Sequence, residues 1–526
     1  MDPPPGESSS NLITAIDHDA FPSLGDDADK SAKSKNASWT ARVISDVTQP
    51  FLDLLLWLNR LREAFGTPFV ASVAVAYGIS QGIAETLGSV TQKYYWKDDM
   101  KVQPSELQAY AAIAELPWDV KPIYGLTTDS FAIAGYHRQP YIALAGLLGT
   151  VCWWWVALDK SLGVLSALLV LCGTNVAIAL PDVVIDASIA VRSRSHPKLA
   201  GDLQGLGWSS FALGGLLGYS ISGSAVEYLK PRGTFGLLSL SSLTLFVASW
   251  WFPDQRVEPR QGDQETGVAR LWRSIRLLAT TAADPVLWKP ALYIYAMQAI
   301  CPDVSDAKFF WYTDTSGVGP GFSETFVGAI YTVGYAGMLV GVAVYNRYLK
   351  DFTYRRVFLY AQLLLAFIGM LDLLLVTRVS LRLGIPDHIF VLGDEAVSRA
   401  FKRLCMMPVY VLAARIVPPG IEGTLFALLM SVSNFGAHSG SWLGAWLLCA
   451  LGVSKSDFSR LWLAVLIRNA SRLLPIAFLF LVPDDLQCGN KRESREPDRQ
   501  MPVEPDASSP LLQRRTSKDF AEADLV

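Results

Sequence analysis

Charged residues are scarce in this chain of 526 residues, since Asp, Glu, Lys and Arg together make up only 18% of it. Hydrophobic residues account for 51% of the chain, and the mean hydropathy is +0.28. A soluble globular domain carries about 25% charged residues, so this composition excludes an ordinary water-soluble fold. The sequence therefore predicts an integral membrane protein.

Cysteine is also rare. The six cysteines are scattered without a Cys-x-x-Cys pair, which argues against a disulfide framework and against a cysteine metal site. The chain lacks the H-E-x-x-H and G-x-x-x-x-G-K-[ST] motifs as well. These absences argue against a metalloprotease and an ATP-driven pump. We expect no enzyme activity, no cofactor, no metal and no nucleic-acid partner.

Long apolar runs, in contrast, recur throughout the chain. About twelve of them approach the roughly 20 residues that cross about 30 Å of hydrocarbon. They form two sets of six, at 67–88, 105–126, 140–158, 162–186, 205–226 and 235–252, then at 285–302, 324–344, 356–376, 388–411, 424–451 and 461–482. The fold class predicted is an all-α membrane protein of two six-helix halves.

The polar segments divide the chain further. We expect a disordered cytoplasmic tail over 1–64, a half over 65–252, a cytoplasmic linker over 253–284, a second half over 285–483 and a second tail over 484–526. Leu54 to Phe65 mixes leucines with arginines, as an interfacial helix does. Lys and Arg favour the loops on one side, so both termini are expected in the cytoplasm.

An internal repeat supports the division into halves. Six residues recur 222 positions later, pairing Pro197 with Pro419, Gly201 with Gly423, Leu206 with Leu428, Ser209 with Ser431, Gly214 with Gly436 and Gly218 with Gly440. Two halves in the same orientation are the parallel repeat of major-facilitator transporters. The four glycines are expected to let helix backbones approach closely.

Several motifs together resemble the folate-biopterin transporter family over roughly residues 65–483. They are Lys121-Pro122-Ile123-Tyr124-Gly125 with Asp129, Gly135-Tyr136-His137-Arg138, Asp182-Val183-Val184-Ile185-Asp186-Ala187, Gly201-Asp202-Leu203-Gln204, Pro419-Gly420-Ile421-Glu422-Gly423-Thr424 and Asn434. The resemblance implies a secondary transporter that moves folates or pterins by alternating access. A carrier of another solute, such as S-adenosylmethionine or a nucleoside, is the alternative within transporters.

A membrane enzyme is the remote alternative. Asp182-x-x-x-Asp186 has the clustered aspartates with which intramembrane prenyltransferases hold magnesium and a diphosphate. Such enzymes usually need a second aspartate-rich cluster, and the sequence offers no convincing partner.

Ionisable residues inside the first apolar runs suggest a transport path. Charges at membrane depth cost at least about 2.5–3.5 kcal/mol, so Glu85, Glu115, Asp119 and Lys121 are expected to line a substrate or proton path. Glu115 and Asp119 share a helix face and repel, which requires a proton, a cation or water nearby. Lys121 is expected to meet the substrate or an acid of another helix, with a buried structural pair as the alternative. Trp118 is a candidate stacking wall.

Further charges predict a gate and a latch. Asp182 and Asp186 are followed by Arg192 and Arg194, which favours a cytoplasmic gate or an interhelical salt bridge. Gly125, Asp129 and Arg138 resemble the loop signature between the second and third helices of major facilitators, where an acid and a cation latch the two halves on one side.

The tenth helix carries the best candidates for binding an anion. Arg399 and Arg403 share a face, and a guanidinium offers bidentate geometry to a substrate carboxylate. The alternative is local neutralisation of Arg399 by Glu395. Trp208, Tyr331 and Tyr335 are further aromatic candidates for the stacking wall, and His438 is expected to be a hydrogen-bonded packing residue rather than a proton relay.

The remaining expectations concern partners and location. The first twenty residues contain four acids and no Lys or Arg, so a plasma-membrane or vacuolar and endomembrane location is expected ahead of a plastid. The lipid bilayer, a small-molecule substrate and protons are the expected partners of a monomer.

Overall fold

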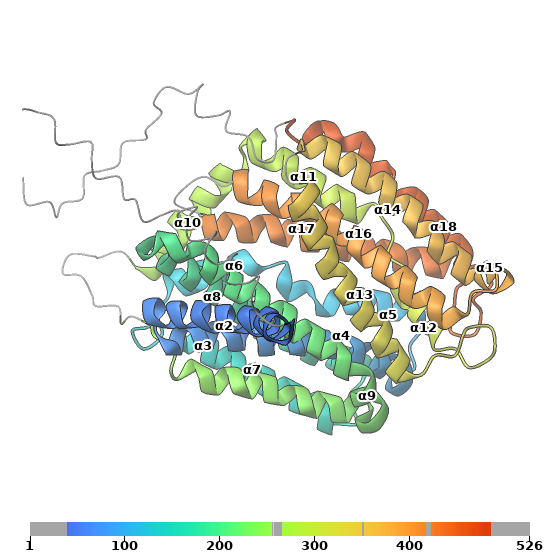
Figure 1. The fold of residues 1–526 in the computed structure, drawn as a ribbon, viewed down its shortest axis with the longest axis horizontal. Coiled ribbons are helices and arrows are strands. Elements are labelled where there is room, and N and C mark those ends of the chain that lie inside the picture. The colour runs from blue at the N-terminus through green and yellow to red at the C-terminus, as the bar shows by residue number, and fades with distance from the viewer. Residues whose placement is uncertain (1–38, 255, 257–265, 350–351, 417–421, 485–526) are drawn as a thin grey trace, which may run out of the picture.

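The computed structural model describes residues 39–254, 256, 266–349, 352–416 and 422–484. Within these ranges the regular structure is helical, with only two isolated β-bridges. The predicted tails fall mostly on 1–38 and 485–526, which lie outside the described residues. Figure 1 shows the N-terminal half in blue and green, beside the C-terminal half in yellow and orange.

The N-terminal half contains six spans. They are a helix over Thr67–Asp99 made of α3 (Thr67–Ala74), η2 (Val75–Ile83), α4 (Ala84–Tyr94) and η3 (Tyr95–Asp99); an interrupted span of α5 (Pro104–Ala114), η4 (Leu116–Trp118) and α6 (Lys121–Ser130); α7 (Gln139–Leu158); α8 (Val164–Ser195); and α9 (Ala200–Ser249), which joins two spans at a kink at Lys230. A single turn, η5 (Pro197–Leu199), links α8 to α9.

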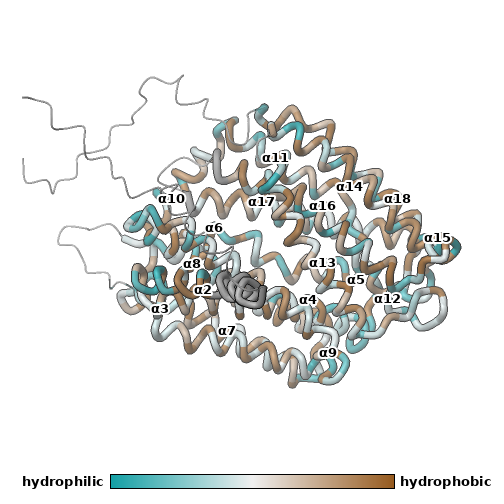
Figure 2. Tube along the Cα trace, in the orientation of Figure 1, coloured by the Kyte–Doolittle hydropathy of each residue, from teal (hydrophilic) through white to brown (hydrophobic). Residues whose placement is uncertain are grey.

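The C-terminal half repeats this arrangement. Its spans are α11 (Pro285–Ala299) with α12 (Ser305–Tyr312); α13 (Glu324–Val344) with η6 (Tyr345–Leu349); α14 (Tyr354–Val376); α16 (Asp387–Ile416); α17 (Glu422–Ala450); and α18 (Leu461–Ser471) with η7 (Leu474–Leu481). The short helix α15 (Val379–Arg382) precedes α16. Within the part of the chain that the structure describes, six helices are long and apolar enough to cross a membrane by length and composition alone. Figure 2 shows apolar residues along the helices of both halves.

Two helices lie outside the spans. The interfacial helix expected over 54–65 is the end of a longer helix, α2 (Trp39–Phe65). The segment predicted as a linker over 253–284 contains a second helix, α10 (Gly267–Ala282). In Figure 1, α10 marks one end of the bundle and α15 the other; we name these the linker end and the distal end.

The second span differs from the continuous helix expected over 105–126. It breaks between α5 and α6, where Pro117 lies in the first turn of η4 and Pro122 in the first turn of α6. Proline has no N–H to donate and clashes with the preceding turn, so it is tolerated at a helix start but not in the interior. The break therefore places Asp119 between two helices.

The repeated glycines pack as expected, and they do so in the same way in both halves. A Cβ on Gly214 would lie 2.0 Å from the carbonyl oxygen of Gly78 in the first span. In the second half, a Cβ on Gly440 would lie 2.6 Å from the carbonyl oxygen of Gln298 in α11. The fifth span thus packs on the first as the eleventh packs on the seventh, which is the relation a parallel repeat requires.

The halves meet along two seams. In the first, α9 packs on α13, and a Cβ on Gly223 would lie 2.4 Å from the carbonyl oxygen of Glu324. In the second, α5 and α6 pack on α17. The first seam has close backbone contacts, and the second has polar contacts. Together the two seams position the residues described next.

Candidate functional site between the halves

A polar network lies inside the N-terminal half. Lys121 on α6 pairs with Asp182 on α8, with 2.5 Å between Nζ and Oδ2. Gln81 also donates to Asp182, and the Tyr77 hydroxyl donates to Asp186. Tyr77 and Gln81 belong to the π-helical segment η2, and such segments occur frequently at functional sites. The sequence predicts that Lys121 meets either the substrate or an acid of another helix. The structure shows it paired with an acid of another helix.

The broken second span fixes Trp118 beside this network. The indole N–H of Trp118 donates to Asn175 Oδ1 at 3.0 Å, and Lys121 Nζ lies 4.5 Å from the centroid of the Trp118 ring. The hydrogen bond and the cation–π contact hold the ring in one orientation. One face of Trp118 is therefore covered by Lys121.

Glu85 on α4 lies near ionisable residues of both halves. Its charged neighbours include Glu115, Lys121 and Asp182, and it is itself among the charged neighbours of Tyr335 on α13. The Glu85 side chain is nevertheless exposed. An exposed carboxylate at this depth is placed where a transport path would run.

His438 on α17 connects the halves. Its Nδ1 lies 2.9 Å from Asp119 Oδ2 and its Nε2 lies 3.3 Å from Glu115 Oε2. Only 5% of His438 is exposed. The two acids, which the sequence reading expected to need a proton, a cation or water, thus share a histidine of the other half. The sequence predicts a hydrogen-bonded packing residue at this position; the structure shows the hydrogen bonds and adds their partners.

The C-terminal half contributes a cation among aromatic rings. Arg399 pairs with Glu395, with 2.5 Å between Nε and Oε1. Its guanidinium carbon lies 5.3 Å from the ring centroid of Tyr331 and 5.9 Å from that of Tyr219 on α9. The two tyrosines stack with centroids 5.6 Å apart. Local neutralisation by Glu395 is therefore present, and Arg399 also contacts the opposite half.

The other candidates have contacts of their own. Arg403 donates to the Tyr410 hydroxyl of its own helix at 3.2 Å, a different partner from that of Arg399. Trp208 is 56% exposed and packs edge-on against Phe211. Tyr335 lies at the first seam, where its hydroxyl donates to the Phe211 carbonyl at 3.5 Å.

The latch candidates lie together at the linker end. Arg138 pairs with Asp129, with 2.7 Å between NH2 and Oδ1. Asp254 Oδ2 accepts from the backbone N–H of Arg138 at 2.7 Å, which ties the latch to the start of the linker. Gly125 lies one turn before Asp129 on α6, where a Cβ would lie 3.5 Å from Val183.

The expected partners of the gate are corrected. Asp182 forms an interhelical salt bridge, but with Lys121, and Arg192 instead donates to the Pro253 carbonyl at 2.8 Å and lies 4.1 Å from the ring centroid of Phe69. Asp182 and Arg192 are ten residues apart on one helix, a rise of about 15 Å. The side chains cannot bridge that distance.

Other contacts, which the sequence reading missed, join charges far apart in the chain. Asp372 on α14 pairs with both Lys308 and Arg468, all three buried inside the C-terminal half. Lys93 on α4 pairs with Asp306 on α12, across the halves. The available signal was a charge within an apolar run, as at Asp372 and Arg468, but one sequence does not reveal the partner.

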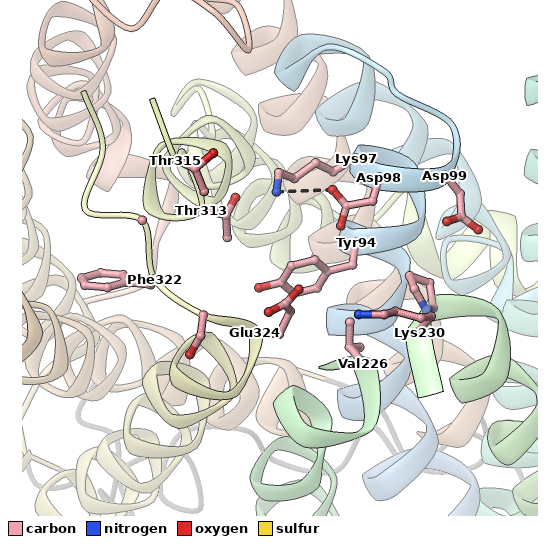
Figure 3. Close-up of a pocket in the computed structure, with 13 residues that line it drawn as sticks. Tyr94, Lys97, Asp98, Asp99, Val226, Lys230, Thr313, Thr315, Phe322 and Glu324 are labelled. Atoms are coloured by element: carbon pink, nitrogen blue, oxygen red, sulfur yellow. Dashed lines mark ion pairs between the residues drawn. The ribbon is translucent and has the colours of Figure 1, made fainter. Parts of the chain in front are cut away.

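The distal end holds a cavity of about 500 Å³ between the halves. Figure 3 shows charged side chains from both halves around it, with Lys97 and Asp98 paired at 3.4 Å and Glu324 contributed by the other half. Deeper in the bundle, Lys93 and Asp306 join the halves. Cross-half ion pairs of this kind have to separate if the distal end opens.

Comparison with known proteins shows which fold this arrangement belongs to. The structure superposes on the nucleoside transporter NupG with a TM-score of 0.53 and 14% identity, covering 79% of this chain and 98% of that one. It also superposes on a bacterial homologue of the human lysosomal transporter Spinster with a TM-score of 0.55 and 11% identity, covering 78% of this chain and 95% of that one. These similarities show a twelve-helix major-facilitator fold.

Sequence comparison identifies the family. The profile of the BT1 family matches residues 81–501. Probable folate-biopterin transporter 2 of Arabidopsis thaliana is 41% identical over 451 residues, which cover 85% of this chain and 88% of the relative. The folate-biopterin transporter of Synechocystis is 32% identical over 414 residues, which cover 78% of this chain and 81% of the relative. The chain therefore belongs to the BT1 family of transporters.

Proposed function

We propose that this protein is a secondary transporter that moves folates or pterins across a membrane by alternating access. The observation that carries the proposal is the convergence of Glu85, Arg399 and the Tyr219–Tyr331 stack on the space between the halves. The names of its relatives point to the same substrates, and their fold supports the same mechanism. A substrate held between two halves is exposed to each side in turn as the halves rock.

Arg399 is proposed to bind a carboxylate of the substrate. A guanidinium matches a carboxylate in geometry, and about a third of the Arg399 side chain is exposed although it pairs with Glu395. The aromatic rings of Tyr219 and Tyr331 offer a surface for a flat heterocycle nearby. Folate carries glutamate carboxylates and biopterin carries none, so this contact would favour folates.

The acids of the N-terminal half are proposed to form the proton path. Glu85 and Glu115 are exposed within the bundle, and His438 links Asp119 to Glu115. Lys121 and Asp182 form the adjoining ion pair within the same half. The Asp129–Arg138 pair at the linker end is proposed as the latch on the cytoplasmic side.

One observation favours a second class of substrate. The face around Glu85 and Glu115 is rich in acids, with Lys121 as a cation nearby. Such a face would accept a cationic metabolite, and S-adenosylmethionine combines a sulfonium with a carboxylate that Arg399 could bind. A transporter of S-adenosylmethionine is therefore the alternative that the experiment must separate.

The test is uptake of labelled folic acid and biopterin into proteoliposomes, with and without an inward proton gradient. We expect saturable uptake of both compounds, stimulated by the gradient. Unlabelled S-adenosylmethionine and a nucleoside serve as competitors, and empty liposomes as the control. If inserted, folded protein takes up neither folic acid nor biopterin but does take up S-adenosylmethionine, the alternative substrate replaces the proposed one.

A plasma-membrane or endomembrane location and a monomeric state are also proposed. The location rests on the acidic composition of residues 1–20. Fluorescence microscopy of the tagged full chain would show the membrane, with a plastid as the contrary outcome. Light scattering of the purified protein in detergent would give the oligomeric state.

A further inference from the structure

His438 occupies an unusual chemical position at the second seam. Each of its ring nitrogens faces a carboxylate oxygen of the other half, Asp119 Oδ2 at 2.9 Å and Glu115 Oε2 at 3.3 Å. The histidine is buried, and so is Asp119, with 9% of its side chain exposed, whereas 55% of the Glu115 side chain is exposed. A buried contact on one side thus leads to a group that solvent can reach on the other.

This geometry requires an extra proton. A neutral imidazole carries one N–H and therefore donates to only one of the two acids, while its other nitrogen presents a lone pair. An ionised carboxylate accepts hydrogen bonds but donates none. Both contacts are satisfied only when the ring is an imidazolium or when one acid is protonated. With the seam closed, His438, Asp119 and Glu115 together therefore hold one proton more than they hold when they are apart, with the ring neutral and both acids ionised.

The groups around the ring agree with this requirement. The charges that act on His438 most strongly are the two acids. Lys121, the cation nearest to them in the chain, is turned to Asp182. From α11, the Tyr295 hydroxyl shares a hydrogen bond with Ser439 at 3.2 Å. The carbonyl of Cys301, just after α11, faces the backbone of α17 at Gly440. Asp119 Oδ1 is buried without a hydrogen-bond partner among the described residues.

Neighbouring contacts join the same two elements. Ser431 and Asn434 of α17 each donate to the Trp118 carbonyl at 3.4 Å. These bonds are long and neutral, so the charged contact at His438 is the strongest polar link between α17 and the broken second span. Protonation of His438 would therefore decide how firmly this second seam closes.

We propose that His438 carries the coupling proton and that its protonation clasps α17 to Glu115 and Asp119. A proton from solvent reaches the clasp through exposed Glu115 and is held on the imidazole, which then donates to both acids. When the proton leaves to water on the other side, the neutral ring retains one contact and the seam can separate. This inference rests on the proposed transport function and adds a residue to it, on the opposite half from the proposed acids.

The test measures the opening of the distal end as a function of pH, in the full chain and without substrate. Spin labels are attached at Lys160→Cys and Arg382→Cys, in a background with the native cysteines replaced by alanine. Both positions are exposed, Lys160 in the turn after α7 and Arg382 at the end of α15. Electron–electron double resonance then reports the distance between the halves in nanodiscs at several values between about pH 5.5 and about pH 9.5, a range that spans histidine titration. We expect the distribution to move from shorter to longer distances as pH rises.

Two histidine variants separate the clasp from general effects of pH. His438→Gln keeps a hydrogen-bonding side chain that cannot gain a proton, so we expect its distance distribution to stay constant across the range. His388→Gln is the matched control, because the His388 ring packs against Phe322 and Phe326, with centroids 4.9 Å and 4.6 Å away, and it should follow the parent profile. A profile for His438→Gln that coincides with the parent would overturn the proposal.

The acids test the same contact from the other half. If His438→Gln does not fold, Asp119→Asn and Glu115→Gln replace it; flat profiles support the clasp, and parent-like profiles overturn it. The transport function fails by a different measurement, namely absent uptake of folate and biopterin by the unmodified protein. The distance profiles decide the role of His438 whichever way that uptake result falls.

Discussion

Lys121 and Asp182 form an ion pair, 2.5 Å between Nζ and Oδ2, that joins the second and fourth spans at the break in the second. The pair is largely buried, with 15% of the lysine side chain and 9% of the aspartate side chain exposed. Because two prolines interrupt the helix nearby, this contact and the hydrogen bond from Trp118 to Asn175 hold the broken segment against α8. The pair thus links helix geometry to the candidate transport path.

Removing one partner of this pair should destabilise the protein strongly. Lys121→Met leaves a buried carboxylate unpaired, which typically costs about 3–5 kcal/mol. Thermal unfolding of the purified protein in detergent should show a large decrease in the midpoint. The double variant Lys121→Met with Asp182→Leu should recover much of the loss, because it leaves no unpaired charge. Equal instability of the single and double variants would contradict this role.

The proposed carboxylate anchor predicts a difference between two substrates. Arg399→Gln removes charge-assisted hydrogen bonds worth about 1.5–3 kcal/mol, so the apparent affinity for folic acid should fall roughly 10- to 100-fold. Biopterin has no carboxylate, so its affinity should change little. Competition binding to proteoliposomes measures both. Since Arg399 also neutralises Glu395, the variant Arg399→Gln with Glu395→Gln is the control for local charge; equal losses for both substrates would refute the anchor.

The buried charges of the C-terminal half predict a structural effect. Asp372 accepts from both Lys308 and Arg468, so Asp372→Asn leaves two buried cations without this counter-charge. Asp394 is a second buried acid beside these cations, so we expect a loss of about 3 kcal/mol rather than the full cost of an unpaired buried charge. Asp457→Asn, at an exposed acid of the distal end, should leave the unfolding midpoint nearly unchanged. Size-exclusion profiles and thermal unfolding compare the two variants.

Two glycine-to-alanine substitutions on α9 should change the stability of the protein in opposite directions. At Gly214 a Cβ would lie 2.0 Å from a backbone oxygen, so Gly214→Ala forces the first and fifth spans apart and should cost about 1–3 kcal/mol. At Gly236, also inside α9, a Cβ meets nothing within 4 Å, so Gly236→Ala should stabilise the helix by about 0.5–1 kcal/mol. Thermal unfolding of both variants measures the contrast, and a stabilising Gly214→Ala would refute the packing argument.

The latch pair predicts a kinetic effect with little change in stability. Half of the Asp129 side chain is exposed, and exposed ion pairs contribute only about 0.2–1 kcal/mol. Asp129→Asn should therefore barely move the unfolding midpoint, yet change the rate of uptake. Exchange of the charges, Asp129→Arg with Arg138→Asp, should restore part of the rate. Unchanged uptake in the single variant would remove the pair from the latch.

Local signals in the sequence were enough for much of the architecture. The apolar runs predicted membrane spans because hydrocarbon accepts only backbone whose hydrogen bonds are made within the helix. The identities 222 residues apart predicted the parallel repeat, and the family motifs predicted membership. The break in the second span was missed although Pro117 and Pro122 are visible in the sequence, since an apolar run does not show whether a proline lies at a helix start or in its interior.

The sequence by itself thus determined the class of protein, the two halves, the family and which charges are anomalous for a membrane. Only the tertiary structure decided their partners. Glu115 and Asp119 contact His438, more than 300 residues later in the chain. Asp182 pairs with Lys121 and not with the arginines of its own helix. Helix formation and membrane insertion depend on neighbours along the chain, whereas an ion pair between helices depends on packing geometry, which one sequence does not contain.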